Sequence, residues 1–331
     1  MSRRPVILSL TKMHEAGMRL LREAGELRMA SATDPATLQR EVLGADALII
    51  RTGGIVDAAL LDCGRDLKVV GRHGVGYDQI DIAAATERGI QVVYTPGANT
   101  ESVVQHVLAM MIGLSKHFPL MSAALAAGNY HFRTSIVGRE LTNRSLGIIG
   151  FGRIGRRVGE VAHQAFGMKV AYHDIVPAPP EIEARAGARR TTFEDVLATS
   201  EYVTLHVPLD ASTHHMIDRA AIARMRPDAI LINACRGPVT VEAAVAEALD
   251  AGRLFGYGAD VFEVEPPPAD HPLIGRTNRN LMLTPHSAAQ TEEGLRNMAE
   301  GVALDVLGVL SGEPPRNPVN DPALVKRNRK G

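Results

Sequence analysis

The sequence predicts an α/β protein of two domains, each a doubly wound parallel sheet. Two observations carry this prediction. Short apolar runs alternate with helical patterns almost from end to end, which is typical of βαβ units and a parallel sheet. The 331 residues are enough for two domains of ordinary size.

The first hundred residues contain one alternating series. Its expected strands cover residues 6–10, 47–50, 68–71 and 91–94, with a weaker one near 27–29, and its helices cover 15–23, 36–43, 57–63 and 80–88. A long apolar helix is expected from residue 101 to about 127, where Gly128, Asn129 and Tyr130 end it.

A second series begins at Ser145. Its expected strands cover residues 146–150, 169–173, a short run near 189–191, 202–206, 230–233, 254–259 and 281–284, and one helix between them covers 242–251. A final helix is expected over about 291–310, followed by a Pro-rich, basic tail. Few residues follow that helix, so we expect it to return and pack on the first domain.

Composition argues against several classes of protein. The hydrophobic content of 45% and charged content of 22% are typical of a soluble globular protein. A formal net charge of −1 gives no indication of a nucleic-acid partner or an electrostatic membrane contact. No apolar run reaches the roughly eighteen residues of a membrane span. The run near the N-terminus is also too short for a signal peptide.

Cysteine and histidine content indicates neither disulfides nor a metal. Cys63 and Cys235 are too few for a disulfide framework and have no metal-ligand spacing. A reducing, cytoplasmic location fits. The twelve histidines form no HExxH motif or zinc-type cluster. For the adjacent pair His214 and His215 we expect an ordinary surface role, because neighbouring residues rarely share one ligand geometry.

The segment 145–155 carries the strongest functional motif. An apolar run enters Gly150-x-Gly152-x-x-Gly155, a helical pattern follows, and a second apolar run ends at Asp174. This order indicates a dinucleotide-binding βαβ unit, whereas a glycine-rich turn alone would be structural. Gly150 allows the tight turn, Gly152 lets the backbone approach the pyrophosphate, and Gly155 lets helix and strand pack closely.

The start of the next helix and the distant acid indicate which cofactor binds. The helix begins near Arg153 and Ile154 and offers free N–H groups and a positive dipole end to the phosphates. The Asp174 carboxylate can accept hydrogen bonds from the ribose of NAD but would repel the extra phosphate of NADP. Residues 175–177 supply no arginine to neutralise that phosphate. NAD is therefore the expected cofactor.

Three later strands end in polar residues. They lead to Arg236, to Glu265 and to His286. Ligands of open parallel sheets bind outside the carboxyl ends of strands. These three side chains can therefore meet around one bound molecule, although any one of them alone could simply cap a loop.

Six segments together form a specific pattern. They are GRHGVGYD at 71–78, TPGANT at 95–100, LHVPL at 205–209, NACRG at 233–237, DVFEVEP at 260–266 and TPH at 284–286. Through them nearly the whole chain resembles the D-isomer-specific 2-hydroxyacid dehydrogenase family, which includes phosphoglycerate, glycerate, formate and D-lactate dehydrogenases.

The resemblance implies a fold and an assembly. A flavodoxin-like substrate domain would consist of residues 1–98 plus 290–331, with a Rossmann NAD-binding domain, residues 99–289, inserted into it. A homodimer joined largely through the NAD domain is implied. The C-terminal regulatory domains of longer phosphoglycerate enzymes are not expected.

It also implies roles for further residues. The cofactor site would include His206, Pro208 and Asp260, although Asp260 is better suited to supporting its loop than to acid–base work. Substrate contacts would come from the first domain, at Arg51, Arg72, His73, Gly74, Val75 and Gly76. His73 stands where relatives often have a small residue, and it either contacts the substrate or lines the loop.

The chemistry follows from the residue types. Oxidising a 2-hydroxy acid removes the hydroxyl proton while hydride leaves C2 for the nicotinamide. His286 suits the base, and a carboxylate such as Glu265 bonded to one ring nitrogen would fix its tautomer. Glu265, rather than Glu263, has the family's place before proline. Arg236 would bind the substrate carboxylate or polarise the keto oxygen.

Three residues have plainer interpretations. Cys235 beside Arg236 is expected to pack as a small residue, since no step needs a nucleophile. Gln105 and His106 stand where many relatives have Glu-His, and a helix-face hydrogen bond is expected there.

The identity of the acid stays open. Arg51 and Arg72 resemble phosphate-contacting arginines of phosphoglycerate dehydrogenases, which places a 3-phosphoglycerate-like substrate slightly ahead of glyoxylate, hydroxypyruvate or another small 2-keto acid. A rival class is the NAD-binding transcriptional co-repressors, which share this fold and the same Arg, Glu and His. That interpretation requires a peptide groove and usually an extended disordered tail.

Overall fold

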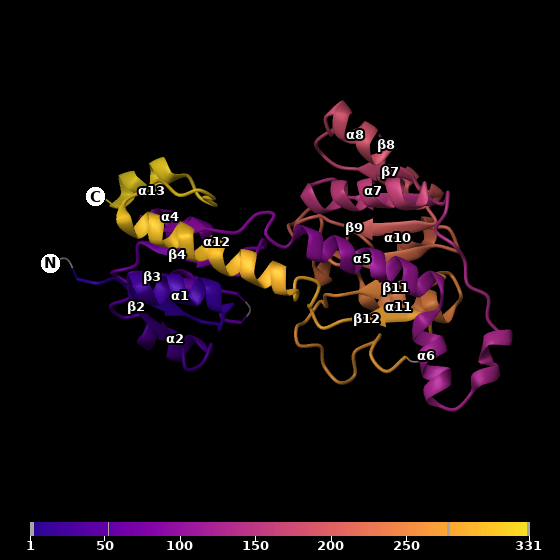
Figure 1. Ribbon diagram of the computed structural model, residues 1–331, viewed down its shortest axis with the longest axis horizontal. Coiled ribbons are helices and arrows are strands. Elements are labelled where there is room, and N and C mark those ends of the chain that lie inside the picture. Colours follow the sequence, from indigo (N-terminus) through magenta and orange to yellow (C-terminus); the bar gives the residue numbers. More distant parts are fainter. Residues whose placement is uncertain (1–2, 52, 277–278, 330–331) are drawn as a thin grey trace. The chain divides into compact units, whose positions relative to one another are not determined.

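The chain divides into two compact units. The computed structural model describes residues 3–51, 53–276 and 279–329, so the expected domain ends at residues 1 and 331 lie outside the described part. The first unit comprises Met1–Asn99 with Gln290–Gly331, and the second comprises Thr100–Ala289 (Figure 1).

The first unit is built on a five-stranded parallel sheet with the order β2-β1-β3-β4-β5. This is the flavodoxin-like strand order. The strands are β1 Val6–Ser9, β2 Glu26–Met29, β3 Ala47–Ile50, β4 Val69–Arg72 and β5 Gln91–Val93. The helices are α1 Glu15–Ala24, α2 Pro35–Glu41, α3 Ala58–Cys63, α4 Ile82–Glu87, α12 Glu292–Ser311 and α13 Pro322–Arg329.

Alternation along the strands builds a core on each face of this sheet. On β3, Leu48 and Ile50 pack in a cluster with side chains of α2, α3 and α4. Ala47 and Ile49 point the other way and pack with α1 and α12. Successive residues of a strand face opposite sides, so one apolar run serves both cores. The helix α12, which the sequence predicted to return to the first domain, therefore packs on the sheet of the first unit.

The second unit is built on a seven-stranded parallel sheet with the order β12-β11-β10-β9-β6-β7-β8. Its strands are β6 Ser145–Ile149, β7 Lys169–His173, β8 Ala188–Arg190, β9 Tyr202–Leu205, β10 Ile230–Asn233, β11 Gly256–Ala259 and β12 Leu281–Leu283. Its helices are α5 Thr100–Ser115, α6 Phe118–Ala126, η1 Tyr130–Thr134, α7 Arg153–Phe166, α8 Pro180–Ala186, α9 Phe193–Thr199, α10 Arg219–Arg224, η2 Gly237–Val239 and α11 Glu242–Asp250.

The second sheet is also covered on both faces. Leu146 and Ile148 of β6 pack in one cluster with α5 and α7. Ile149 packs in the other with α9, α10 and α11. Strand order reverses between β6 and β9, as in a Rossmann sheet, which creates a ligand-binding switch point there. The two doubly wound parallel sheets confirm the predicted fold class.

The prediction of a single long helix over residues 101–127 is wrong, because the structure has two helices there. The chain breaks after α5, where His117 takes a left-handed conformation with φ 55°, and α6 begins at Phe118. Pro119 lies in the first turn of α6, where its missing N–H costs no helical hydrogen bond. A proline inside the helical pattern was the available signal for this break.

The tail after α12 contains the helix α13, which the sequence prediction missed. Asp321 accepts a hydrogen bond from Ala323 N (2.8 Å), and Pro322 occupies the first helical position. Buried Asn320 ties the tail to the sheet, because its Oδ1 accepts from Val92 N (2.8 Å) and its Nδ2 donates to Ile90 O (2.9 Å).

Among the described residues, no single helix has the length and hydropathy to cross a membrane. The bent pair α5 and α6 passes that test together, by length and composition only.

Candidate functional site

The predicted site residues of the second unit all follow the carboxyl ends of strands in one parallel sheet. Gly150 follows β6, and Asp174 follows β7. Arg236, Glu265 and His286 follow β10, β11 and β12. Parallel strands end at the same edge, so the fold brings these loops to one side of the sheet.

Two of the three glycines in the glycine-rich loop, Gly150 and Gly155, occupy positions where a side chain would not fit. Gly150 has φ 91°, and a Cβ there would lie 2.5 Å from His206 O. A Cβ on Gly155 would lie 2.2 Å from Gly150 O, so only glycine lets the helix approach the turn. Gly152 has open space where a Cβ would stand.

The helix α7 leaves its first turn open to a ligand. It begins at Arg153 and Ile154, and Gly152 before it supplies no capping side chain. Free N–H groups at a helix start are suited to phosphate. The loop and helix therefore fit the pyrophosphate of a dinucleotide.

Asp174 is oriented by main-chain groups. Its Oδ2 accepts from Phe151 N (2.6 Å), and its Oδ1 accepts from Val176 N (2.9 Å). The carboxylate is thus held at the end of β7, next to the glycine-rich loop. That place suits a contact with the adenosine ribose of NAD.

His206 and Pro208 lie on the loop after β9. The Nε2 atom of His206 lies 3.0 Å from Thr204 Oγ1. Desolvation lowers the pKa of His206 to about 3, so the ring is neutral at pH 7. Pro208 O accepts a hydrogen bond from Thr213 Oγ1 (2.7 Å).

Arg236 is presented by a loop that Asn233 organises. Asn233 Nδ2 donates to Arg236 O (2.8 Å), and its Oδ1 accepts from Cys235 N (3.1 Å). The side chain of Arg236 is half-buried, and its Nη1 donates to Cys235 O (2.6 Å). The buried asparagine therefore fixes the backbone from which the guanidinium projects.

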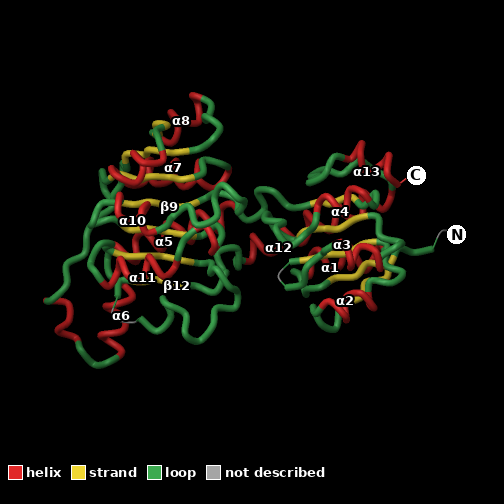
Figure 2. Tube along the Cα trace, turned by 180° about the vertical axis from the view of Figure 1, so that it is seen from behind, coloured by secondary structure: helices red, strands yellow, loops and turns green. Residues whose placement is uncertain are grey.

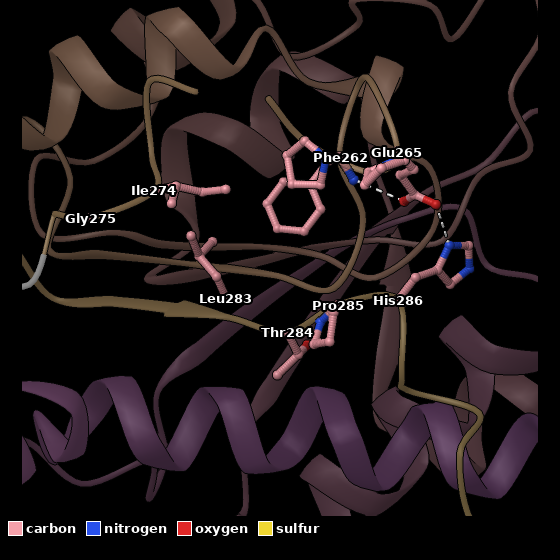
Figure 3. Close-up of a pocket in the computed structure, with 10 residues that line it drawn as sticks. Phe262, Glu265, Ile274, Gly275, Leu283, Thr284, Pro285 and His286 are labelled. Carbon is pink, nitrogen blue, oxygen red and sulfur yellow. Dashed lines mark hydrogen bonds and ion pairs between the residues drawn. The ribbon is translucent and has the colours of Figure 1, made fainter. Parts of the chain in front are cut away.

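Glu265 and His286 form a hydrogen-bonded pair across two loops. His286 Nδ1 lies 2.7 Å from Glu265 Oε2, while Glu265 Oε1 accepts from Phe262 N (3.0 Å) (Figure 3). Both side chains are open to solvent, at 42% for His286 and 38% for Glu265. His286 Nε2 makes no hydrogen bond with any described residue, so it is available to a substrate hydroxyl.

Local interactions keep Glu265 ionised. Partial burial would raise the pKa of this carboxyl, but the hydrogen bonds from His286 and Phe262 and the charge of Arg236 outweigh it. The pKa of Glu265 therefore lies below its ordinary value. A carboxylate on Nδ1 leaves Nε2 as the atom that can exchange a proton with substrate.

Asp260 holds the turn that carries His286. Its Oδ1 accepts from Ser287 N and its Oδ2 from Ala288 N, both at 2.8 Å. His286 N donates to Asp260 O (2.7 Å), and His286 itself has φ 50°. Asp260 thus supports the loop, as expected from its position.

His106 of α5 joins the same network. Its Nε2 lies 2.9 Å from Thr284 Oγ1, and that hydroxyl donates to Asp260 Oδ1 (2.5 Å). The helix-face hydrogen bond expected for His106 is therefore directed at the turn that carries His286.

A buried pair that the sequence analysis did not single out anchors the Glu265 loop. His271 Nε2 lies 2.6 Å from Glu242 Oε2, with both side chains almost fully buried. Glu242 Oε1 accepts from Glu263 N (3.1 Å). A Cβ on Gly237 would lie 1.9 Å from Phe262 C, so the Arg236 and Glu265 loops are in direct backbone contact. No spacing rule in the sequence indicated this pair.

A cavity of about 400 Å³ opens beside the Glu265–His286 pair (Figure 3). Phe262, Ile274, Leu283 and Pro285 give it an apolar lining, with Ile274 and Leu283 on the side away from the pair. The glycine-rich loop does not line it. The cavity therefore places apolar surface next to the Glu265–His286 pair.

The predicted substrate loop lies in the first unit. Gly74 N donates to Thr95 Oγ1 (3.0 Å), and Thr95 N donates to Gly74 O (3.0 Å). Arg72 Nε donates to Gly76 O. Val75 and Gly76 are partly exposed. The loop is thus held by its own backbone and by Thr95.

Arg51 and the buried ring of His73 lie close enough in the first unit for the charge of Arg51 to act on the histidine. Arg51 is half-buried and makes no hydrogen bond or ion pair with any described residue, and burial lowers its pKa. His73 is 1% exposed, and neither ring nitrogen has a hydrogen-bond partner. Burial, followed by the charge of Arg51, lowers the pKa of His73 to about 4. The observed burial favours the loop-lining interpretation of His73.

Cys235, Glu263 and His214 each contact a neighbouring side chain of the second unit. Cys235 Sγ donates to Asn233 Oδ1 (3.2 Å), and desolvation raises the pKa of this thiol to about 11. Glu263 Oε1 lies 2.8 Å from His215 Nε2, so Glu263 is not the partner of His286. His214 joins His215 and Glu263 in a group that could hold a metal ion, and its ring centroid lies 3.8 Å from that of His215 with the ring planes tilted by 31°.

Comparisons with known proteins bear on the same segments. The family model described as D-isomer specific 2-hydroxyacid dehydrogenase, NAD binding domain, matches residues 108–288, which confirms NAD as the cofactor. D-3-phosphoglycerate dehydrogenase of Methanocaldococcus jannaschii is 38% identical over 319 residues, which cover 96% of this chain and 60% of that protein.

Solved structures are similar over nearly their whole length. A glyoxylate reductase from Paecilomyes thermophila is 28% identical with a TM-score of 0.86, covering 96% of this chain and 99% of that one. D-lactate dehydrogenase of Aquifex aeolicus, complexed with NAD and lactic acid, is 28% identical with a TM-score of 0.83, covering 93% and 96%. The chain spans about half to three fifths of the length of the curated relatives it matches.

Proposed function

The chain belongs to the D-isomer specific 2-hydroxyacid dehydrogenase family, and we propose that it interconverts a D-2-hydroxy acid and its 2-keto acid by NAD-dependent hydride transfer. The observation that carries this proposal is the 2.7 Å contact between His286 Nδ1 and Glu265 Oε2, at the sheet edge that also holds Arg236 and the glycine-rich loop.

Each side chain has a defined task in this proposal. When bound, NAD accepts or supplies the hydride at C2 of the acid. His286 Nε2 takes the hydroxyl proton during oxidation and returns it to the keto oxygen during reduction. Glu265 stabilises the imidazolium form and fixes the ring. Arg236 orients the substrate through its carboxylate or keto oxygen.

The cofactor contacts come from the second unit. Gly150, Gly152, Arg153, Ile154 and Gly155 would hold the pyrophosphate. Asp174 would bind the ribose, and His206 and Pro208 would lie beside the nicotinamide. Asp260 would shape that end of the site through the turn it supports. We therefore propose residues 99–289 as the NAD-binding domain and residues 1–98 with 290–331 as the substrate domain.

For the substrate we propose a 3-phosphoglycerate-like acid, with glyoxylate or hydroxypyruvate as the alternative. Support comes from the guanidinium of Arg51, which is half-buried and has no internal partner among the described residues. A second arginine, Arg72, belongs to the substrate loop itself. His73, Gly74, Val75 and Gly76 would complete the substrate loop. The similarity to a D-3-phosphoglycerate dehydrogenase favours the 3-phosphoglycerate-like acid. The similarity to a glyoxylate reductase supports glyoxylate or hydroxypyruvate as the alternative.

The test is a panel of 2-keto acids assayed with NADH. Phosphohydroxypyruvate, hydroxypyruvate and glyoxylate are compared by kcat/KM from the loss of NADH absorbance. The proposal expects steady turnover of at least one acid, with phosphohydroxypyruvate ahead. Turnover led by the unphosphorylated acids would select the alternative substrate class.

We further propose a cytoplasmic homodimer formed through the second unit. The two cysteines are free thiols, which fits a reducing compartment. The segment α6–η1 extends away from its sheet (Figures 1 and 2), and α6 buries none of its apolar residues. Leu125, Tyr130 and Val137 are 62%, 60% and 85% exposed. Light scattering of a Leu125→Glu variant, expected to be monomeric, tests this interface.

A further inference from the structure

Arg190 lies against the residue that is expected to select the cofactor. In the register of β7 and β8, Arg190 is opposite Tyr172, two residues before Asp174. Its Nη2 donates to Asp174 O (2.8 Å) and its Nε to the same oxygen (3.3 Å). Arg190 Nη2 also donates to Ile175 O (3.4 Å). The sequence around Asp174 contained no arginine, but the next strand supplies one.

The charge of Arg190 is not neutralised by the Asp174 carboxylate. That carboxylate is turned toward Phe151 N and Val176 N, and no ion pair joins it to Arg190 in the described part of the chain. The guanidinium is exposed, and its Nη1 has no hydrogen-bond partner among the described residues. The Nη1 edge of a planar cation is therefore open near Asp174.

The surrounding charges leave this cation available. Glu183 of the neighbouring helix α8 accepts a hydrogen bond from Tyr172 Oη (2.7 Å), and no ion pair joins it to Arg190 in the described part of the chain. Arg189 precedes Arg190 on β8 and faces the other side of the strand. Asp174 and Arg190 are thus the two opposite charges at this end of β7.

We propose that Arg190 is the cationic half of a 2′-phosphate site, and that the Asp174 carboxylate alone keeps this site closed to NADPH. The inference rests on the proposed binding of the dinucleotide at the Gly150–Gly155 loop. A phosphate on the ribose 2′ position would meet both groups. Repulsion by Asp174 disfavours it, while a guanidinium binds phosphate through paired N–H donors.

The experiment measures binding, so it does not depend on turnover. Isothermal titration with NADH and with NADPH is done on the wild type, Asp174→Asn, and Asp174→Asn combined with Arg190→Gln. Asparagine keeps a side-chain oxygen for Phe151 N or Val176 N while removing the charge. The matched control combines Asp174→Asn with Arg189→Gln, which removes the same charge one residue away on the other face.

We expect Asp174→Asn to lower the Kd for NADPH by about tenfold or more, since charge-assisted hydrogen bonds of this kind reach that size. The gain should shrink at high salt. Adding Arg190→Gln to Asp174→Asn should remove most of the gain in NADPH affinity. Adding Arg189→Gln instead should leave that gain in place. If Asp174→Asn does not fold, Asp174→Ser serves, with NADH binding as the criterion of an intact site.

Two results would overturn the inference. One is a double variant with Arg190→Gln that binds NADPH as tightly as Asp174→Asn does. The other is an Asp174 variant that binds NADH but gains nothing for NADPH. A wild type that binds neither dinucleotide would instead contradict the proposed function, so the two failures are distinguishable.

Discussion

The Nδ1 atom of His286 lies 2.7 Å from Oε2 of Glu265, and this contact joins two loops that follow different strands of one sheet. The loop that carries each partner is held by a further acidic side chain. Asp260 binds the backbone of the His286 turn, and Glu242 binds the backbone of the Glu265 loop. The pair is therefore held in position before any ligand binds.

Replacing Glu265 with Gln should change the pH–rate profile. The lowered pKa of Glu265 means that it is a carboxylate throughout the neutral range and loses its charge only below its ordinary pKa. Removing a negative charge 2.7 Å from the ring disfavours the imidazolium. The limb of the keto-acid reduction profile that requires protonated His286 should shift to lower pH. Kinetics from pH 5 to 9 check this, and an unaltered profile would show that Glu265 is not the partner.

Replacing Arg51 with Ala should identify the acid. Arg51 has no internal hydrogen bond in the described structure, so its removal should leave the fold intact. Loss of a charge-assisted bond of roughly 1.5–3 kcal/mol would raise KM for phosphohydroxypyruvate about tenfold or more, with glyoxylate kinetics barely changed. Arg72→Ala should act similarly, although it also frees Gly76 O. The control is Arg19→Ala, because the Arg19 side chain is exposed and its loss should leave KM for every acid unchanged.

Equal losses on every acid in the Arg51 and Arg72 variants would remove the phosphoglycerate proposal. The two arginines would then bind the carboxylate common to all substrates or shape the loop.

Replacing His271 with Ala should destabilise the second unit and slow catalysis. It leaves the Glu242 carboxyl buried without its 2.6 Å partner, and breaking a buried pair costs about 3–5 kcal/mol. The Glu263 backbone loses a firmly held acceptor, so kcat should fall as well. Urea unfolding measures the stability. The control is His215→Ala, which removes an exposed partner of Glu263 and should cost about 1 kcal/mol or less.

Acid should destabilise the first unit through His73. The unfolded histidine titrates near 6.5, whereas burial lowers the folded pKa to about 4. Between these values the unfolded chain binds a proton that the folded chain does not, so stability falls as pH drops from about 6.5 to about 4. The loss is about 1 kcal/mol per pH unit for one histidine. Unfolding curves should show a shallower pH dependence in His73→Gln, and an identical slope would contradict this account.

Much of the fold could be predicted because short buried strands and glycine turns leave strong local patterns. The first three residues of β1, Val6–Ser9, and all four of β3, Ala47–Ile50, are apolar, which is typical of parallel sheets covered on both faces. The break at His117 and the helix α13 were missed because weak local signals, Pro119 and the Asp321–Pro322 pair, were outweighed by apolar content and by a Pro-rich tail. Helix boundaries depend on such caps.

The site was only partly visible in the sequence for a different reason. Arg236, Glu265 and His286 stand at strand ends, so strand prediction alone places them at one sheet edge. Arg190 and the Glu242–His271 pair act through contacts between segments 16 to 29 residues apart. No local spacing rule encodes such contacts, although the parallel register of β7 and β8 would have placed Arg190 near Asp174.

The most direct test of the central claim is the rate of NADH oxidation by wild type and His286→Ala with the best 2-keto acid of the panel, alongside the Kd for NADH. General acid–base help is worth about 10²–10⁴-fold, so kcat should fall by that factor while NADH binding is nearly unchanged. A His286→Ala variant that keeps kcat within a few-fold of wild type would contradict the assignment of His286 as the proton-transfer group.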